Sequence, residues 1–563
     1  MCHFHTPDII EYGSESLVIV TGDSDELSFM RVLKKNLVRG WHRFTRRMSP
    51  PVFIGSALCV IGFCIFGGLY TATASEAFSG LQQSISRSFS WYYALTVTVF
   101  VVFAFWLMAS PYGRLRLGPP DSRPEFRYPA WFAMLFSAGM GTGLVFWGVA
   151  EPLYHHANPL FAEGGTPEAA KEAMRYTFFH WGLHPWAIYI LFGASIAYFH
   201  FRHDLPLAPR SILHPLIGRH IEGPIGHGVD ILCTVGTLLG VSTSLGLGAM
   251  QINSGLAQYM DIPLQTNVQV GIIAVITLVA TVSVVSGIKA GIRRLSLINM
   301  ALAFGLMTFV FFAGHTIYIL ETLVGSLGIY IQKLPEMSLW VEYTKNTDWQ
   351  ATWTMFYWGW WISWSPFVGV FVARISRGRT LREFVLSVML IPTLVTFVWL
   401  SVFGGSALHI ELFGDGGLSQ IVQEDVSLSL HAMLEALPLA GVTMMWATLV
   451  IVIFFITSSD SGSLVDDMVT SGGHPNPPRA QRVFWAVSEG SVAATLLIVG
   501  GLRAIQDASI SLGFFMSFLL IAICLSLYKA LRSERNMTRV GSHGDFRIKP
   551  WSQQPGDAGE PGP

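Results

Sequence analysis

The sequence predicts an all-α polytopic membrane protein with twelve transmembrane helices. Of its 563 residues, 52% are hydrophobic and only 13% are charged, whereas a soluble chain carries about 25% charged residues. The apolar residues gather in runs of about 20, the length that an α-helix needs to cross the hydrocarbon core of a bilayer. The links between these runs alternate between basic and acidic or uncharged, as a membrane topology requires.

The predicted spans follow one another along almost the whole chain. They lie near 51–72, 90–110, 128–149, 177–201, 228–256, 267–287, 296–322, 351–374, 384–406, 440–462, 481–501 and 505–530. The basic links are the N-terminal tail, 114–127, 202–219, 289–294, 374–382, 479–482 and 529–539. Cytoplasmic links carry the excess of positive charge, so both termini are predicted to be cytoplasmic in a multi-pass protein of the cell (inner) membrane.

Outside the spans, residues 1–50 form a basic N-terminal tail, and residues 531–563 are predicted to be a disordered cytoplasmic tail. Segment 28–48 is roughly amphipathic, which fits either a helix on the anionic leaflet or an ordinary positive flank. The five cysteines form no C-x-x-C pair, which argues against a disulfide framework or a zinc site. Nucleotide-binding and hydrolase motifs are absent in a suitable context, so the sequence predicts neither ATP-driven transport nor an enzyme.

Two spans are interrupted at corresponding places. The third contains SAGMGTG at 137–143, and the eighth contains Gly359 and Pro366. Paired interruptions of this kind indicate a transporter built from inverted repeats, with its binding site near the middle of the membrane. The two spans are five apart, so the repeats are predicted to be 128–350 and 351–530. Residues 51–127 then form two additional helices ahead of them.

Two groups of aromatic residues fall in these predicted core helices. They are Trp181, Trp186 and Tyr189 in the fourth span, and Trp358, Trp360, Trp361 and Trp364 in the eighth. On a single helix, the first group would share an arc of about 140°. Aromatic ring faces suit a quaternary ammonium, which spreads its charge over methyl groups and has no N–H to donate. The alternative interpretation is an interfacial aromatic belt or simple packing.

Two other patterns offer polar groups inside the membrane. Gly139, Gly141 and Gly143 let a helix unwind, exposing amides that suit a carboxylate and carbonyls that suit Na⁺; close helix packing is the alternative. The run FFITSSDS at 454–461 offers hydroxyl oxygens to a hard monovalent cation, unless they bond back to their own helix. Asp460 fits a structural cap or a proton carrier.

Three more residues leave alternatives open. His180 and His184 are four residues apart, as in a metal-binding pair. No carboxylate or cysteine joins them in the sequence, so a role as helix-end histidines is the simpler interpretation. Glu151 follows the third span, where a gate and a helix-end role both fit.

Together these segments resemble the betaine/choline/carnitine transporter family over about residues 50–530. The matching stretches are GMGTGLVFWGVAEP (139–152), FHWGLHPWAIY (179–189), SLGLGAMQI (244–252), WGWWISWSPFVGVFVARISRGRT (358–380) and FFITSSDSGS (454–463). The resemblance implies twelve spans with a LeuT-like five-plus-five inverted repeat, and a homotrimer in the lipid bilayer. Its ligands would be small quaternary-ammonium molecules and not nucleic acid.

The resemblance also implies roles for individual residues. An aromatic box is matched by Trp181, Trp186, Tyr189 and Trp361, a route toward the cytoplasm by Trp364, and further substrate contacts by Met140, Gly141, Gly143 and Ser244. A sodium site is matched by Ser137, Met140, Phe454, Thr457 and Ser458. A second sodium site is matched by Thr237 and Phe367, but Val241 replaces its other hydroxyl, so the number of sodium ions is left open. Trp358 and Trp360 are interpreted as packing residues.

The expected function is import of glycine betaine or a related quaternary-ammonium compatible solute by sodium symport and alternating access. Proton-coupled choline members of the family tend to carry aspartate where this chain has Gly143, so the uncharged motif resembles the sodium-coupled betaine type. Thr142 departs from the usual aliphatic residue, which leaves the exact substrate open. No cofactor other than Na⁺ is expected. The alternatives are a choline or carnitine transporter that couples to protons or works by exchange, a membrane-embedded enzyme, and a channel.

Overall fold

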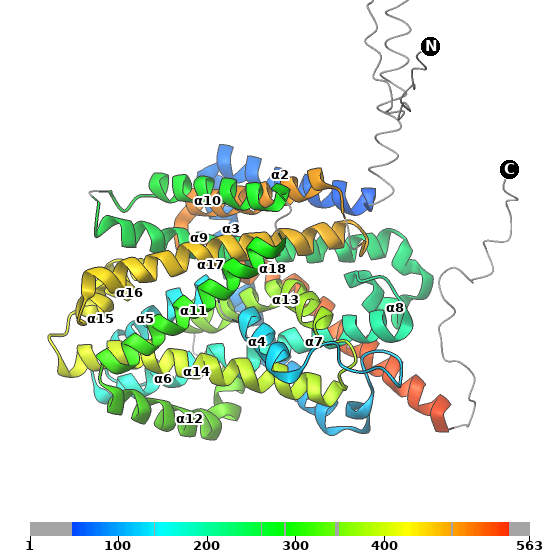
Figure 1. Cartoon of the computed structure of the whole chain (residues 1–563), viewed down its shortest axis with the longest axis horizontal. Helices are drawn as coiled ribbons and strands as arrows, with labels where there is room; N and C mark the ends of the chain where they lie inside the picture. The colour runs from blue at the N-terminus through cyan, green and yellow to red at the C-terminus, as the bar shows by residue number, and fades with distance from the viewer. Residues whose placement is uncertain are drawn as a thin grey trace, which may run out of the picture. The chain divides into compact units, whose positions relative to one another are not determined.

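Helices make up almost all of the part of the chain that the structure describes (Figure 1). This computed structural model describes residues 48–139, 141–260, 262–286, 289–343, 348–474 and 477–539. Within these ranges there is no β-strand, only one isolated bridge between Arg116 and Thr380. The all-α prediction is therefore confirmed. The predicted amphipathic segment 28–48 lies almost wholly outside the described residues.

The long helices are α2 (Pro50–Leu69), α3 (Thr71–Ala109), α4 (Tyr128–Gly139), α5 (Thr142–Ala157), α6 (Pro167–Trp181), α7 (Leu183–His203), α9 (Pro224–Ala257), α10 (Thr266–Ser286), α11 (Lys289–Ala313), α12 (Thr316–Leu339), α13 (Phe356–Arg374), α14 (Leu381–Phe413), α17 (Ala440–Thr470) and α18 (Arg479–Arg539). Short helical turns complete the described chain: η1 (Pro111–Arg114), η2 (Pro209–Leu213), α8 (His214–Ile217), η3 (Gly218–Glu222), η4 (Ala351–Met355), α15 (Leu418–Glu424), η5 (Val426–Leu428) and α16 (Ser429–Glu435).

Ten helical stretches within the described residues are long and apolar enough to cross a membrane. The third and eighth predicted spans are not among them, and α18 contains the last two predicted spans. Helix α12 is an additional stretch, because the chain breaks between α11 and α12 where the sequence predicted one span. A polytopic membrane protein is thus supported, while twelve crossings and the inverted repeat stay predictions.

Helix α18 changes direction at Gly500 and Gly501, between the last two predicted spans. Gly501 has φ +58° and ψ −136°, a conformation that favours glycine because it has no Cβ. Beyond this kink α18 runs on to Arg539, so the prediction of disorder from residue 531 is wrong for its first residues. Glu534 in this extension accepts hydrogen bonds from Tyr198 at 2.6 Å and Arg202 at 2.8 Å.

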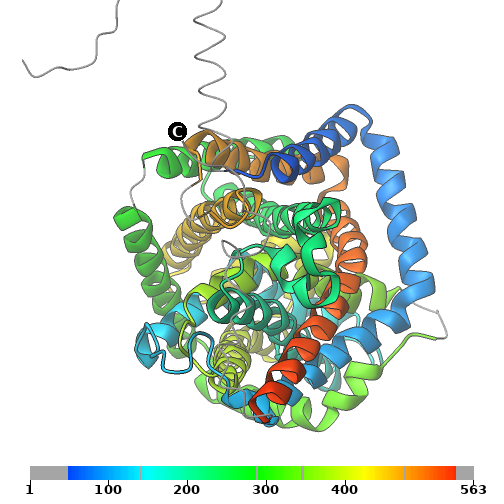
Figure 2. The same cartoon turned by 90° about the vertical axis from the view of Figure 1, so that its right-hand side faces the viewer.

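Helix α13 lies in the interior and packs against α7, α9 and α18. Helices α2 and α3, drawn in blue, lie toward the outside (Figure 2). The interruption predicted within α13 is absent, since Phe356–Arg374 is one continuous helix. Pro366 cannot donate to the carbonyl of Ile362, and the hydroxyl of Ser365 donates to it instead at 2.7 Å.

Gly359 serves close packing in α13. A Cβ at this position would lie 2.5 Å from the carbonyl oxygen of Ser509 and 2.8 Å from the Cα of Ile510, both in the backbone of α18. Contacts with backbone atoms cannot be relieved by a rotamer change. Gly359 therefore permits α13 and α18 to approach each other, and explains why glycine occurs in the middle of this helix.

We predict that Gly359→Ala lowers the thermal unfolding midpoint of the purified protein in detergent. Overpacking against backbone costs about 1–3 kcal/mol, which exceeds the gain of up to about 1 kcal/mol from replacing glycine by alanine in a helix. The matched control is Gly325→Ala in α12, where a Cβ would meet nothing within 4 Å. Equal midpoints for Gly359→Ala and wild type would show that the two helices separate easily.

Candidate functional site

A cavity lies between helices α5, α6, α7, α9, α13 and α14. Its wall is formed by Gly141, Gly143, Leu144, Trp181, Pro185, Trp186, Tyr189, Ser244, Trp360, Trp361, Trp364 and Thr396. None of these wall residues carries a charged side chain, so the described wall offers aromatic faces and a few neutral polar groups.

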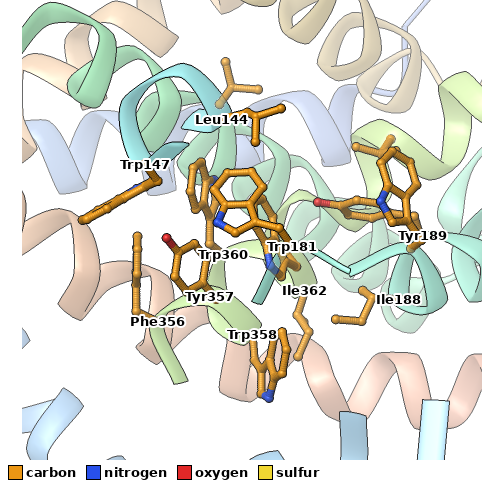
Figure 3. Packing of buried hydrophobic residues seen from close by; sticks show 14 of the residues in the cluster. Leu144, Trp147, Trp181, Ile188, Tyr189, Phe356, Tyr357, Trp358, Trp360 and Ile362 are labelled. Carbon is orange, nitrogen blue, oxygen red and sulfur yellow. The ribbon is translucent and has the colours of Figure 1, made fainter. Parts of the chain in front are cut away.

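The aromatic rings of this cavity lie in two orientations. The indoles of Trp360 and Trp361 are nearly parallel, 4.5 Å apart and inclined by 17°. Trp181 stands across Trp361 at 4.9 Å and 70°, and Tyr189 stands across it at 6.4 Å and 80°. Figure 3 shows Trp181 beside Trp360, with Tyr189 to one side. Rings at right angles present faces from different directions, which is the arrangement that surrounds a compact cation.

A break between α6 and α7 places Trp181 in this wall. Gly182 has φ −87° and ψ −128°, and a Cβ there would lie 2.6 Å from both the carbonyl oxygen of Phe178 and the hydroxyl of Tyr330. The prediction that Trp181, Trp186 and Tyr189 share one helix face is therefore wrong. Trp181 ends α6 while the other two belong to α7, and the break itself brings all three to one cavity.

Three of the four tryptophans of α13 line the cavity, whereas the sequence interpretation assigned only two of them to it. Trp361 and Trp364 line the cavity as expected, but Trp360, interpreted as a packing residue, also lines it. Its ring fits because position 143 is glycine: a Cβ there would lie 2.3 Å from the ring atom Cη2 of Trp360. Trp360 and Trp364 are one helical turn apart and so lie on the same face of α13. This spacing is the sequence signal that marks Trp360 as a wall residue. Trp358 instead stacks on His184, at 5.0 Å and 15°.

Three polar atoms of the wall have no hydrogen-bond partner among the described residues. They are the hydroxyl of Tyr189, the hydroxyl of Ser244 and the indole nitrogen of Trp364, all buried. The N-terminus of α5 also meets the cavity through Gly141 and Gly143. Free amides and the positive end of the helix dipole favour an anionic group there. Thr142 fastens this helix end to α9, donating to the carbonyl of Ser244 at 3.0 Å.

A second cavity lies next to the first, and Gly141 and Trp364 line both. Phe454, Thr457 and Ser458 line this second cavity, so three members of the expected sodium site lie in one wall beside the α4–α5 break. The side chains of the other two, Ser137 and Met140, fall outside the described part of the structure. The Thr457 hydroxyl donates to the carbonyls of Ile453 and Phe454, at 2.9 and 3.2 Å.

The residues of the expected second sodium site are not brought into one cavity. Phe367 lines the second cavity and stacks on Trp364 at 5.6 Å. Thr237 is fully buried in α9, and its hydroxyl has no partner among the described residues. Val241 packs toward Gly462 of α17, where a Cβ would lie 2.9 Å away. A valine side chain supplies no oxygen, so the expected second sodium site lacks the ligand that a hydroxyl at position 241 would provide.

Behind the ring wall lies a buried carboxylate, which the sequence interpretation treated only as a gate or helix-end residue. Glu151 accepts hydrogen bonds from the indole nitrogen of Trp181 at 2.9 Å and the hydroxyl of Tyr357 at 2.5 Å. The Nδ1 atom of His180 lies 2.6 Å from its other oxygen. His180 therefore pairs with Glu151, whereas His184 contacts Ser338, and the two histidines do not form a metal-binding pair.

Glu151, His155 and His180 form the one group of three metal-ligating side chains found among the described residues, with ligand atoms within 4.8 Å. The hydrogen bonds to Glu151 already use both oxygens of its carboxylate. The spacing of Glu151 and His155, four residues apart in an apolar helix, was the sequence signal that could have marked this cluster.

Comparison with known proteins places this geometry in context. The chain matches the betaine/carnitine/choline family of transporters over residues 51–536. An uncharacterised transporter of Mycobacterium tuberculosis is 46% identical over 492 residues, which cover 86% of this chain and 83% of that protein. A glycine betaine transporter of Acinetobacter baylyi is 43% identical over 491 residues, covering 86% and 74%. An osmo-dependent choline transporter of the same organism is 41% identical over 498 residues, covering 87% and 72%.

Proposed function

The chain belongs to the betaine/carnitine/choline transporter family, and we propose that it imports glycine betaine or a closely related quaternary-ammonium solute, driven by sodium. The observation that carries this proposal is the cavity in which Trp181, Tyr189 and Trp361 present ring faces from crossed directions. A trimethylammonium group cannot donate a hydrogen bond, so ring faces stabilise it better than hydroxyls or amides do.

The polar atoms of the same cavity favour glycine betaine over choline. Glycine betaine carries a carboxylate, and the wall offers it the hydroxyls of Ser244 and Tyr189 and the N-terminus of α5. Each is a donor or a positive dipole end, which suits an anion. Choline carries a single hydroxyl, which would leave several of these donors without an acceptor. Choline remains the second candidate, because an osmo-dependent choline transporter is also a close relative.

Sodium is proposed as the coupling ion on two observations. Thr457 and Ser458 line the cavity beside the α4–α5 break. A hydroxyl that donates to a helix carbonyl keeps its lone pairs, so the bonds of Thr457 to its own helix leave its oxygen able to coordinate a cation. Position 143 is glycine, so this chain lacks the aspartate that proton-coupled choline members of the family tend to carry there.

The remaining parts of the proposal concern the protein in its membrane. We propose alternating access, in which the helices of the ring wall move against their neighbours and Na⁺ stabilises the α4–α5 break. The alternating charges of the links support cytoplasmic placement of both termini in the cell membrane. A homotrimer is proposed from membership of the family alone.

The direct test is uptake of labelled glycine betaine, choline and carnitine into proteoliposomes, with sodium and proton gradients imposed separately. We expect saturable uptake of glycine betaine that requires an inward sodium gradient and is unaffected by a proton gradient alone. Uptake of choline driven by protons would favour the alternative. Flux without saturation would indicate a channel.

We predict that Trp361→Ala raises the apparent KM for glycine betaine by about tenfold or more, because it removes one ring face from the cation. The matched control is Trp358→Ala on the same helix, since the two side chains are 2% and 1% exposed but only Trp361 lines the cavity. The control is expected to alter the amount of folded protein but not KM. Unchanged uptake kinetics for Trp361→Ala would rule out the aromatic cavity as the substrate site.

We predict that Thr457→Ala raises the sodium concentration needed for half-maximal uptake by several-fold, because a coordinating oxygen is lost. Thr443→Ala provides a matched control. Thr443 lies on the same helix and also bonds back to its own backbone, at 3.1 Å from the carbonyl of Ala440, but it lines neither cavity. If both variants keep the sodium requirement of wild type, the sodium assignment is wrong.

A further inference from the structure

The carboxylate of Glu151 is fully buried in α5 and has no contact with the cavity itself. Its bonds nevertheless go to residues on two other helices that build the ring wall. Trp181 at the end of α6 and Tyr357 in α13 both donate to Oε2, while His180 of α6 contacts Oε1. One side chain of α5 thus joins the two helices that carry Trp181 and Trp361.

These bonds lead to two rings of the cavity wall. The Trp181 indole is held directly by its nitrogen. The indole nitrogen of Trp361 donates to the backbone carbonyl of His180 at 3.1 Å, so the residue that contacts Glu151 also holds the second ring. Tyr357 lies behind Trp361, nearly parallel to it at 5.7 Å and 26°. Glu151 therefore holds Trp181 directly and is linked to Trp361 through His180 and Tyr357, the residues that contact both.

The donors around Glu151 are compatible with an ionised carboxylate. The Nε2 atom of His180 lies 3.1 Å from the hydroxyl of Thr354. A neutral imidazole that carries its proton on Nδ1 donates to Glu151 and accepts from Thr354, which satisfies both contacts. The indole and phenol donors are neutral. The Nε2 atom of His155 also lies 3.4 Å from Oε1, and no lysine or arginine pairs with Glu151 among the described residues. With both imidazoles neutral, the three hydrogen bonds hold an anion in this place and leave its negative charge unneutralised.

Such a charge strengthens the attraction of the ring wall for a cation in two ways. Hydrogen bonding to an anion shifts electron density into the donor's ring, which makes the ring face more attractive to a cation. A negative charge in a dry environment also attracts a nearby positive charge more strongly than it would in water. Both effects favour a cation in the cavity without placing a carboxylate against it.

We propose that Glu151 is the countercharge and positioning residue of the aromatic cavity: it orients Trp181 and Trp361 and supplies the negative charge that a trimethylammonium ligand meets through the ring wall. This inference rests on the proposed function. It assigns ligand affinity to a residue outside the cavity and predicts that the charge of Glu151, and not only its shape, determines that affinity.

The test compares binding of labelled glycine betaine and of choline to purified full-length protein. Glu151→Gln keeps the size of the side chain and removes its charge, and we expect the affinity for both ligands to fall about tenfold. The control is Glu172→Gln on α6, a buried carboxylate that accepts from the backbone amides of Leu160, Phe161 and Ala162. It should bind both ligands as wild type does.

Tyr357→Phe removes one donor to Glu151 without altering any residue of the cavity wall. We expect it to weaken binding about threefold, and to have no further effect when combined with Glu151→Gln, because the bond it removes then no longer ends on an anion. A role in stability alone would lower the unfolding temperature of these variants while their Kd stayed that of wild type. This pattern would overturn the inference, as would additive effects of the two substitutions.

Failure of the inference and failure of the proposed function give different results. If wild-type protein binds glycine betaine or choline and Glu151→Gln binds it equally well, only the inference is wrong. If wild-type protein binds neither ligand, the proposed function is wrong and the inference falls with it.

Discussion

A single buried carboxylate, that of Glu151, joins three of the helices around the central cavity. It belongs to α5, and its hydrogen-bond partners lie on α6 and α13. Burying an anion inside a membrane protein is costly unless donors surround it, so these partners and the carboxylate depend on one another. Their convergence sets where Trp181 and Trp361 stand, and thereby the shape of the space between the rings. The close contact of α13 with α18 at Gly359 holds the same helix from the opposite side.

The arrangement suggests a division of labour within the site. Aromatic faces meet the part of a ligand that cannot form hydrogen bonds, while the start of α5 and the hydroxyl of Ser244 offer donors to its other end. The same start of α5 separates this cavity from the one lined by Thr457 and Ser458. Gly141 and Trp364 line both cavities, so the two spaces share part of their walls.

Much of the fold follows from local properties of the sequence. The span predicted at 228–256 is α9 (Pro224–Ala257), because a run of apolar residues identifies a membrane helix without knowledge of its neighbours. Breaks and close contacts are not local. Gly182, where the predicted fourth span breaks, packs against Tyr330, and Gly359 packs against Ser509; both partners lie about 150 residues away. The aromatic residues of the cavity are predictable from their clustering in the sequence, whereas the contacts of Glu151 are not, because its partners come from other helices.

The most direct measurement is a structure of the protein with glycine betaine bound in a lipid environment. The account predicts the trimethylammonium group against the ring faces of Trp181, Tyr189 and Trp361, and the carboxylate directed toward Ser244 and the N-terminus of α5. Glycine betaine bound outside this cavity, or bound inside it with its carboxylate against the rings, would contradict the account.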